Sequence, residues 1–150
     1  MAAGKSGIRR IAIGVDGSES SAAAITWAIR LAKGMGSQVV AVYAVDIPVY
    51  LLESYDIPIQ FDDDWRAAMK SDFENKWCKP LKVAGVKYRT VMEDGRAATV
   101  IAEVAEREKA DLIVVGRRGR GEVAELLLGS ASHELVLHSR LPVLVVSAKA

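Results

Sequence analysis

The chain has 150 residues, of which 51% are apolar and 26% are charged, with a formal net charge of +1. This length and balance predict one globular domain over residues 1–150, with its core between about residues 8 and 148. Because acidic and basic residues are mixed along the chain, the composition argues against a dedicated binder of nucleic acid or of an anionic membrane.

The number of cysteines and the distribution of apolar residues predict the cellular compartment of the protein. Cys78 is the only cysteine, so an internal disulfide is impossible and a reducing compartment is expected. The segment from Met1 to Arg10 contains basic residues but lacks the apolar stretch of a secretory signal. No apolar run approaches the roughly 20 residues that a membrane-spanning helix needs. We therefore expect a soluble, cytoplasmic protein without a membrane partner.

The first part of the chain alternates between strand and helix patterns. An apolar run predicts a strand over Ile8–Val15, and the loop Asp16–Ser18 separates it from a helix that continues to about Lys33. One face of that helix carries apolar residues at helical spacing, namely Ile25, Ala28, Ile29 and Ala32. Val39–Val45 is apolar on both faces, which predicts a central strand. Asp46–Gln60 contains two prolines and no helical period, which indicates a long loop.

The remaining elements continue the alternation. A helix is predicted from Asp62 to about Lys79, which Pro80 should end or kink. Its aromatic and apolar stripe is expected to be core and consists of Trp65, Met69, Phe73 and Trp77. Three strands and two helices complete the chain: Lys87–Met92, a helix from Gly95 to about Lys109, Asp111–Val115, a helix after Gly129, and Val143–Val146.

This alternation predicts the fold class. It is typical of an α/β domain with an open, five-stranded parallel sheet in the order 3-2-1-4-5, Rossmann-like or flavodoxin-like, with helices on both faces. Ligands of such sheets bind at the carboxyl ends of the strands, where the strand order reverses. The first and fourth predicted strands run into Asp16 and Gly116, so both positions are expected to line one crevice.

A glycine pattern follows the fourth predicted strand. Gly116 and Gly119 are separated by two residues, and Gly129-Ser130 comes nine residues after Gly119. Glycines let backbone amides approach an anion, and a helix amino terminus after them favours phosphate. The commoner phosphate motifs do not fit, because Gly119-x-Gly121-x-x-Ala124 lies in the last turn rather than the first, and Gly4-Lys5-Ser6 lacks its first glycine.

At this point the chain resembles the universal stress protein family, in the subclass that binds ATP. The resemblance extends over nearly the whole chain and is weakest between Ile47 and Val86. Four segments carry it: Ile13–Ser18, Ala110–Gly116, Leu127–Ser130 and Leu141–Val146. It implies an adenine nucleotide alpha-hydrolase-like fold, a homodimer, and ATP held with Mg²⁺ or Mn²⁺.

The resemblance also implies roles for matching positions. Gly14 and Val15 would line the adenine pocket, and Ala44 would contact adenine through its backbone. Asp16 would lie near the ribose or a metal-bridged phosphate, with Gly116 beneath the ribose. The phosphates would be held by Gly119, Gly129, Ser130, Ala131 and Ser132. No residue is predicted to be catalytic, and no set of side chains has the spacing of a metal site.

Plainer structural interpretations accompany these roles. Gly129 could simply begin a helix with Ser130 as its N-cap, and Asp16 could be only a helix cap. Asp62, Asp63 and Asp64 suit a helix start better than a divalent metal. Of the basic loop residues, we expect one to touch phosphate without knowing which: Arg117, Arg118 or Arg120.

The function predicted from the resemblance is an ATP-linked regulatory switch in stress response, acting on an unknown protein partner. Bound ATP is expected to order the loops Asp46–Gln60 and Arg117–Glu122. Three alternatives stay open. The protein could be a slow ATPase or an autophosphorylating enzyme, although no general base other than Asp16 is evident. It could bind another adenine nucleotide, such as cyclic AMP, or be a dimeric interaction module with a vestigial site. Dimerisation is expected through the edge strand Val143–Val146.

Overall fold

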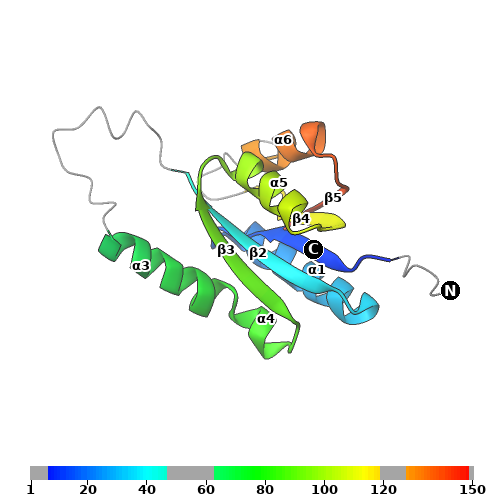
Figure 1. The fold of residues 1–150 in the computed structure, drawn as a ribbon, viewed down its shortest axis with the longest axis horizontal. Coiled ribbons are helices and arrows are strands. Elements are labelled where there is room, and N and C mark those ends of the chain that lie inside the picture. Colours follow the sequence, from blue (N-terminus) through cyan, green and yellow to red (C-terminus); the bar gives the residue numbers. More distant parts are fainter. Residues whose placement is uncertain (1–6, 47–62, 119–127, 149–150) are drawn as a thin grey trace.

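The computed structural model describes residues 7–46, 63–118 and 128–148. The strands in these segments form one parallel sheet (Figure 1). Its 5 strands lie in the order β3-β2-β1-β4-β5, and every neighbouring pair is parallel. The strands are β1 (Arg10–Gly14), β2 (Gln38–Val45), β3 (Tyr88–Asp94), β4 (Leu112–Gly116) and β5 (Val143–Val146). The predicted α/β class and strand order are confirmed.

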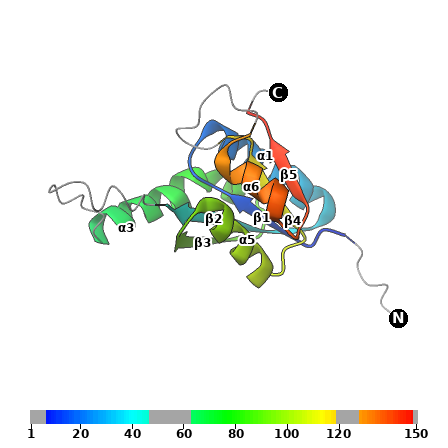
Figure 2. The same ribbon diagram turned by 90° about the horizontal axis from the view of Figure 1, so that it is seen from above.

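Helices cover both faces of the sheet (Figures 1 and 2). On one face lie α1 (Glu19–Met35) and an arm made of α3 (Asp63–Ser71), a π-helix (Asp72–Trp77) and α4 (Lys79–Val83). The other face carries α5 (Ala97–Arg107) and α6 (Ser130–His138). None of the described helices is long and apolar enough to cross a bilayer.

The two faces of the sheet hold two separate cores because side chains alternate along a strand. Ile11 and Ile13 of β1 pack with α1 and the arm, whereas Ala12 between them packs with α5. All three side chains are fully buried. This explains why β1 is an uninterrupted apolar run rather than an alternating one, as expected for the centre of a parallel sheet.

Helix α1 begins and ends with standard caps. The Ser18 hydroxyl accepts a hydrogen bond from the Ser21 N–H at 3.1 Å, and Gly36 ends the helix in the left-handed conformation at φ +68°. Both features match residue preferences at helix ends. The helix therefore starts directly behind the loop that follows β1, which brings that loop to the carboxyl edge of the sheet.

The helix predicted from Asp62 to about Lys79 is wrong in its middle, where the segment changes to π-helical geometry at Asp72 and ends at Trp77. A new helix, α4, begins at Lys79, and Pro80 lies in its first turn. Proline is tolerated in a first turn because its missing N–H would have no helical partner there. Of the predicted core stripe only Phe73 is fully buried, and α3 buries no residue completely.

An ion pair attaches α3 to the sheet. Both terminal nitrogens of Arg66 donate to the carboxylate of Asp94 at the end of β3, at 2.7 and 2.8 Å. This hydrogen bond lowers the pKa of Asp94 and raises the pKa of Arg66. Since both groups are solvent-exposed, the pair contributes little to the stability of the fold. Its main effect is to fix where α3 lies relative to the end of β3.

Cys78 lies between the π-helix and α4 and is completely buried. Burial raises the pKa of its thiol to about 12, with a further contribution from the nearby charge of Glu74. The thiol therefore stays protonated at neutral pH, and because the thiolate is the reactive form, the side chain acts as an inert part of the core.

Candidate functional site

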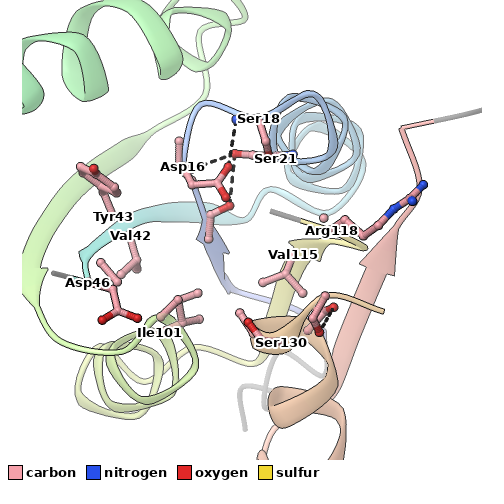
Figure 3. A pocket seen from close by; sticks show the side chains of 18 residues that line it. Asp16, Ser18, Ser21, Val42, Tyr43, Asp46, Ile101, Val115, Arg118 and Ser130 are labelled. Carbon is pink, nitrogen blue, oxygen red and sulfur yellow. Dashed lines mark hydrogen bonds between the residues drawn. The ribbon is translucent and has the colours of Figure 1, made fainter. Parts of the chain in front are cut away.

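A cavity of 360 Å³ lies at the carboxyl ends of β1, β2 and β4 (Figure 3). All the sequence-predicted site residues that the structure describes line it: Gly14, Val15, Asp16, Ala44, Gly116, Gly129, Ser130, Ala131 and Ser132. Gly119 falls outside the described residues, as do Arg120 and most of the two loops expected to respond to ATP. The crevice thus forms where the sheet topology places it, between β1 and β4, whose following helices α1 and α6 cover opposite faces of the sheet.

One end of the cavity opens because β1 and β2 separate. Their last hydrogen bond runs from the Val15 N–H to the Val42 carbonyl, at 2.8 Å. In a parallel ladder alternate residues bond to the same neighbour, and Val45 accepts from Gly95 on the β3 side. The main chain of Ala44 therefore faces the β1 side, where no hydrogen bond joins it to a described residue. Its N–H and C=O form an adjacent donor and acceptor at the cavity wall.

The walls at this end are mostly apolar. Val42, Ile101 and Val115 face the cavity from β2, α5 and β4 (Figure 3). The carboxylate of Asp46, just beyond β2, lies on the same side. A flat apolar group with polar edges would fit this combination, since small-molecule sites pair apolar walls with few polar groups.

The turn after β1 carries a carboxylate into the cavity. Asp16 accepts a hydrogen bond from the Ser18 N–H at 2.9 Å, and its own N–H donates to the Ser21 hydroxyl at 3.1 Å. Gly17 between them has φ +82°, in the left-handed region that favours glycine. Ser18, rather than Asp16, caps α1. The Asp16 side chain is thus held by the turn and lies beside Ser21 in Figure 3.

The amino terminus of α6 forms the opposite end of the cavity. Gly129 is the N-cap in an extended conformation and, as a glycine, has no side chain with which to cap the helix. The first amides of α6, on Ser130, Ala131 and Ser132, therefore lack an intrahelical acceptor. Two hydrogen bonds to the Arg117 carbonyl, from the Gly129 N–H at 2.7 Å and the Ser132 hydroxyl at 2.8 Å, fasten this terminus to the end of β4.

Positive charge accompanies these amides. Arg118 lines the cavity, whereas Arg117 does not. The Nε atom of Arg117 is buried and has no hydrogen-bond partner within the described part of the chain. Among the same residues, no group of three His, Cys, Asp or Glu side chains lies close enough to hold a metal ion. The cavity therefore combines a cationic and amide-rich end with an apolar end.

Sequence reasoning missed several lining residues. Val42, Asp46, Ala97 and Ile101 line the cavity without belonging to any recognised motif. Two signals could have found them: Asp46 directly follows a predicted central strand, and Ala97 and Ile101 occupy the start of the helix that follows the third strand. Both lie at the carboxyl edge of a parallel sheet, where ligands bind.

Comparisons with known proteins agree with this architecture. The model of the universal stress protein family matches residues 7–147. Universal stress protein MJ0531 of Methanocaldococcus jannaschii is 34% identical over 144 residues, which span 92% of this chain and 81% of that protein.

Solved structures share the fold. The hypothetical protein MJ0577, the subject of a structure-based functional assignment, superposes with a TM-score of 0.77 at 24% identity, covering 95% of this chain and 98% of that one. A universal stress protein in complex with cyclic AMP superposes with a TM-score of 0.72 at 25% identity, covering 96% and 100%. The family match over residues 7–147 and the shared fold lead to one conclusion: the chain belongs to the universal stress protein family.

Proposed function

We propose that the protein binds ATP in this cavity and acts as a nucleotide-linked regulatory module in stress response, not as an efficient enzyme. One observation carries the proposal: a single cavity presents at one end the main chain of Ala44, which has no hydrogen bond to another described residue on that side, and at the other end the amino terminus of α6. These are the two recognition elements that a purine base and a phosphate group require.

The Ala44 end suits adenine. The base carries an amino donor next to a ring-nitrogen acceptor, and the Ala44 carbonyl and amide complement that pair. Val42 and Ile101 offer apolar contact for the faces of the ring. The cyclic AMP complex of a relative with a TM-score of 0.72 supports an adenine nucleotide as the ligand class.

The α6 end suits phosphates. The first amides of α6 point toward the cavity end of the helix, and together with the positive end of the helix dipole they favour an anion there, since a helix amino terminus is a common phosphate site. Arg118 adds a charge of the right sign. Between the two ends, the Asp16 carboxylate is placed to accept a hydrogen bond from a ribose hydroxyl.

A divalent metal fits the donor set only as part of a nucleotide complex. Asp16 and Asp46 are the carboxylates that line the cavity, and no ready-made three-ligand cluster exists among the described residues. Mg²⁺ commonly keeps several waters and binds through one or two carboxylates plus substrate phosphates. Asp16 would hold such an ion, and the ion would supply neutralisation of phosphate charge.

A thermal-shift series tests the proposal. We expect ATP to raise the melting temperature by about 5–11 °C at 100 times its Kd, because this excess stabilises a protein of this size by about 2.7 kcal/mol. At the same concentration as ATP, ADP and AMP should give progressively smaller shifts, since each loses phosphate contacts at α6. The series is run with ATP, ADP, AMP and cyclic AMP, each with and without Mg²⁺. A flat response to all four would refute nucleotide binding, and a larger shift with cyclic AMP than with ATP would reassign the ligand.

We further propose a homodimer through β5. This strand pairs with β4 on one side, and no described strand pairs with its other edge. A groove of 520 Å³ adjoins β5 and is lined by Trp27 and Arg30, whose guanidinium lies 5.1 Å from the indole centroid. Exposed apolar surface beside an unpaired edge favours association with a second copy.

Proline substitutions at neighbouring positions of β5 should test its two edges independently. Pro142 and Val146 accept hydrogen bonds from β4, so Val145 directs its N–H to the open edge. We expect Val145→Pro to give a monomer in sedimentation velocity while keeping the fold, because proline is tolerated on edge strands. Leu144→Pro is the control for damage to the β4 side and should lower the melting temperature. A Val145→Pro protein that sediments as the wild type does would exclude this interface.

A further inference from the structure

We propose that Trp77 is a positioning residue for the nucleotide site, holding the turn that carries Asp16. The inference rests on the proposed function, because its effect on affinity requires a bound nucleotide. It gives the helical arm, which lies outside the glycine motifs of the family, a role in shaping the cavity through the turn after β1.

The Trp77 indole packs against the turn at Gly17, where it leaves no room for a side chain. A Cβ atom built on Gly17 would lie 2.6 Å from Cε2, 2.7 Å from Cζ2 and 2.9 Å from Nε1 of the Trp77 indole. The ring therefore occupies the space that any side chain at position 17 would need. With the indole on one side and the Ser18 N–H bound to Asp16 on the other, the turn has little room to rearrange.

Other aromatic rings hold Trp77 in place. Tyr43 packs edge-on against it with centroids 5.2 Å apart, and Phe73 lies at 6.4 Å. Such pairs are worth about 0.5–1.5 kcal/mol beyond their buried area. Tyr43 also lines the cavity. Trp77 thus contacts two segments that form the site, the turn after β1 and the end of β2.

The π-helix explains how Trp77 reaches the turn. The Cys78 N–H donates to the Phe73 carbonyl at 3.0 Å, a spacing of five residues where an α-helix has four. The wider turn lets Phe73 and Cys78 both face the core, and Trp77 beside them meets Gly17. π-helical turns are rare and frequently occur at functional sites. A regular α-helix would have rotated Trp77 relative to Phe73.

A double-mutant cycle tests whether Trp77 acts through Asp16. We expect Trp77→Leu to weaken ATP binding about tenfold, measured by calorimetry, and to have no further effect in an Asp16→Asn background, because residues that act as one unit are not additive. Trp77→Phe should restore most of the affinity. The matched control is Leu81→Ala, which loosens the same arm at its buried α4 end without removing a ring that packs on Trp77 and should leave ATP affinity within about twofold of the wild type. Equal losses in both backgrounds, or the same loss in Leu81→Ala, would overturn the proposal.

A second measurement does not need the nucleotide. Amide hydrogen exchange at Ser18 reports opening of its hydrogen bond to Asp16. We expect faster exchange at Ser18 in Trp77→Leu than in Leu81→Ala; equal rates would overturn the role of Trp77 in holding the turn. If the wild-type protein binds no nucleotide, the proposed function fails, and Ser18 exchange still decides whether the indole holds this loop.

Discussion

Ala131→Asp should weaken ATP binding by at least about 100-fold while leaving the fold intact. Ala131 is in the first turn of α6 and lines the cavity. A carboxylate there would occupy the amides proposed to hold phosphate and would repel it; two unit charges 4 Å apart near a protein surface interact by about 4 kcal/mol. A fraction of that energy suffices, because each factor of ten in affinity corresponds to about 1.4 kcal/mol.

The same substitution should stabilise the free protein. An acidic residue near a helix amino terminus contributes about 0.3–1 kcal/mol through the helix dipole, and α6 has no other side-chain cap. Ala131→Asn is the matched control, since it has nearly the same volume without the charge and should lose much less affinity. Calorimetric titration and thermal melts of the three proteins measure both effects. Equal losses for aspartate and asparagine would show that bulk, not charge, matters at this position.

Gly116→Ala should lower the melting temperature by roughly 2–12 °C, the range expected when overpacking costs about 1–3 kcal/mol in a protein of this size. A Cβ at Gly116 would lie 2.5 Å from the Ser20 carbonyl carbon and 2.7 Å from its oxygen, so the clash is with the main chain of α1. A backbone cannot rotate away as a side chain can, and α1 must move from β4.

The displacement of α1 should also disturb the proposed nucleotide site. Ser21, the next residue of α1, accepts a hydrogen bond from the Asp16 N–H. We therefore expect Gly116→Ala to weaken ATP binding in addition to lowering stability. Gly34→Ala serves as the control, because a Cβ at Gly34 in the same helix meets no atom within 4 Å. Gly34 lies in the last turn of α1, so its replacement by alanine should raise stability by up to about 0.5–1 kcal/mol, the gain found in helix interiors. Thermal denaturation that ranks the two variants in the opposite order would contradict this account of the packing.

Local patterns were sufficient to predict the sheet. Val143–Val146 was placed correctly to the residue because Pro142 and the following apolar run leave little choice. The start of α6 at Ser130 follows from Gly129 in the same way. Strand order followed from β-α alternation, since right-handed crossovers allow few arrangements of a parallel sheet.

Features that depend on contacts distant in sequence were not predictable. The π-helix arises because Phe73 and Cys78 must both reach the core, and no propensity encodes that requirement. Trp77 was assigned to a core stripe from its spacing, yet its neighbour is Gly17, 60 positions away in the chain. Asp46 and Ile101 line the cavity only because two separate crossovers return the chain to one edge of the sheet.

The central position of β1 has a consequence for how the molecule is made. Its partner β4 lies about a hundred residues downstream, and the Asp111 carboxylate just before β4 accepts hydrogen bonds from the Arg9 and Arg10 amides, 102 and 101 positions apart. A nascent chain can pair β1 with β2 early, but the α6 end of the cavity forms only after Ser130–His138 has been made. Non-local pairing of this kind slows folding. The proposed nucleotide would therefore be held only once β1, β4 and α6 have come together, so that ligand occupancy would report a fully assembled sheet.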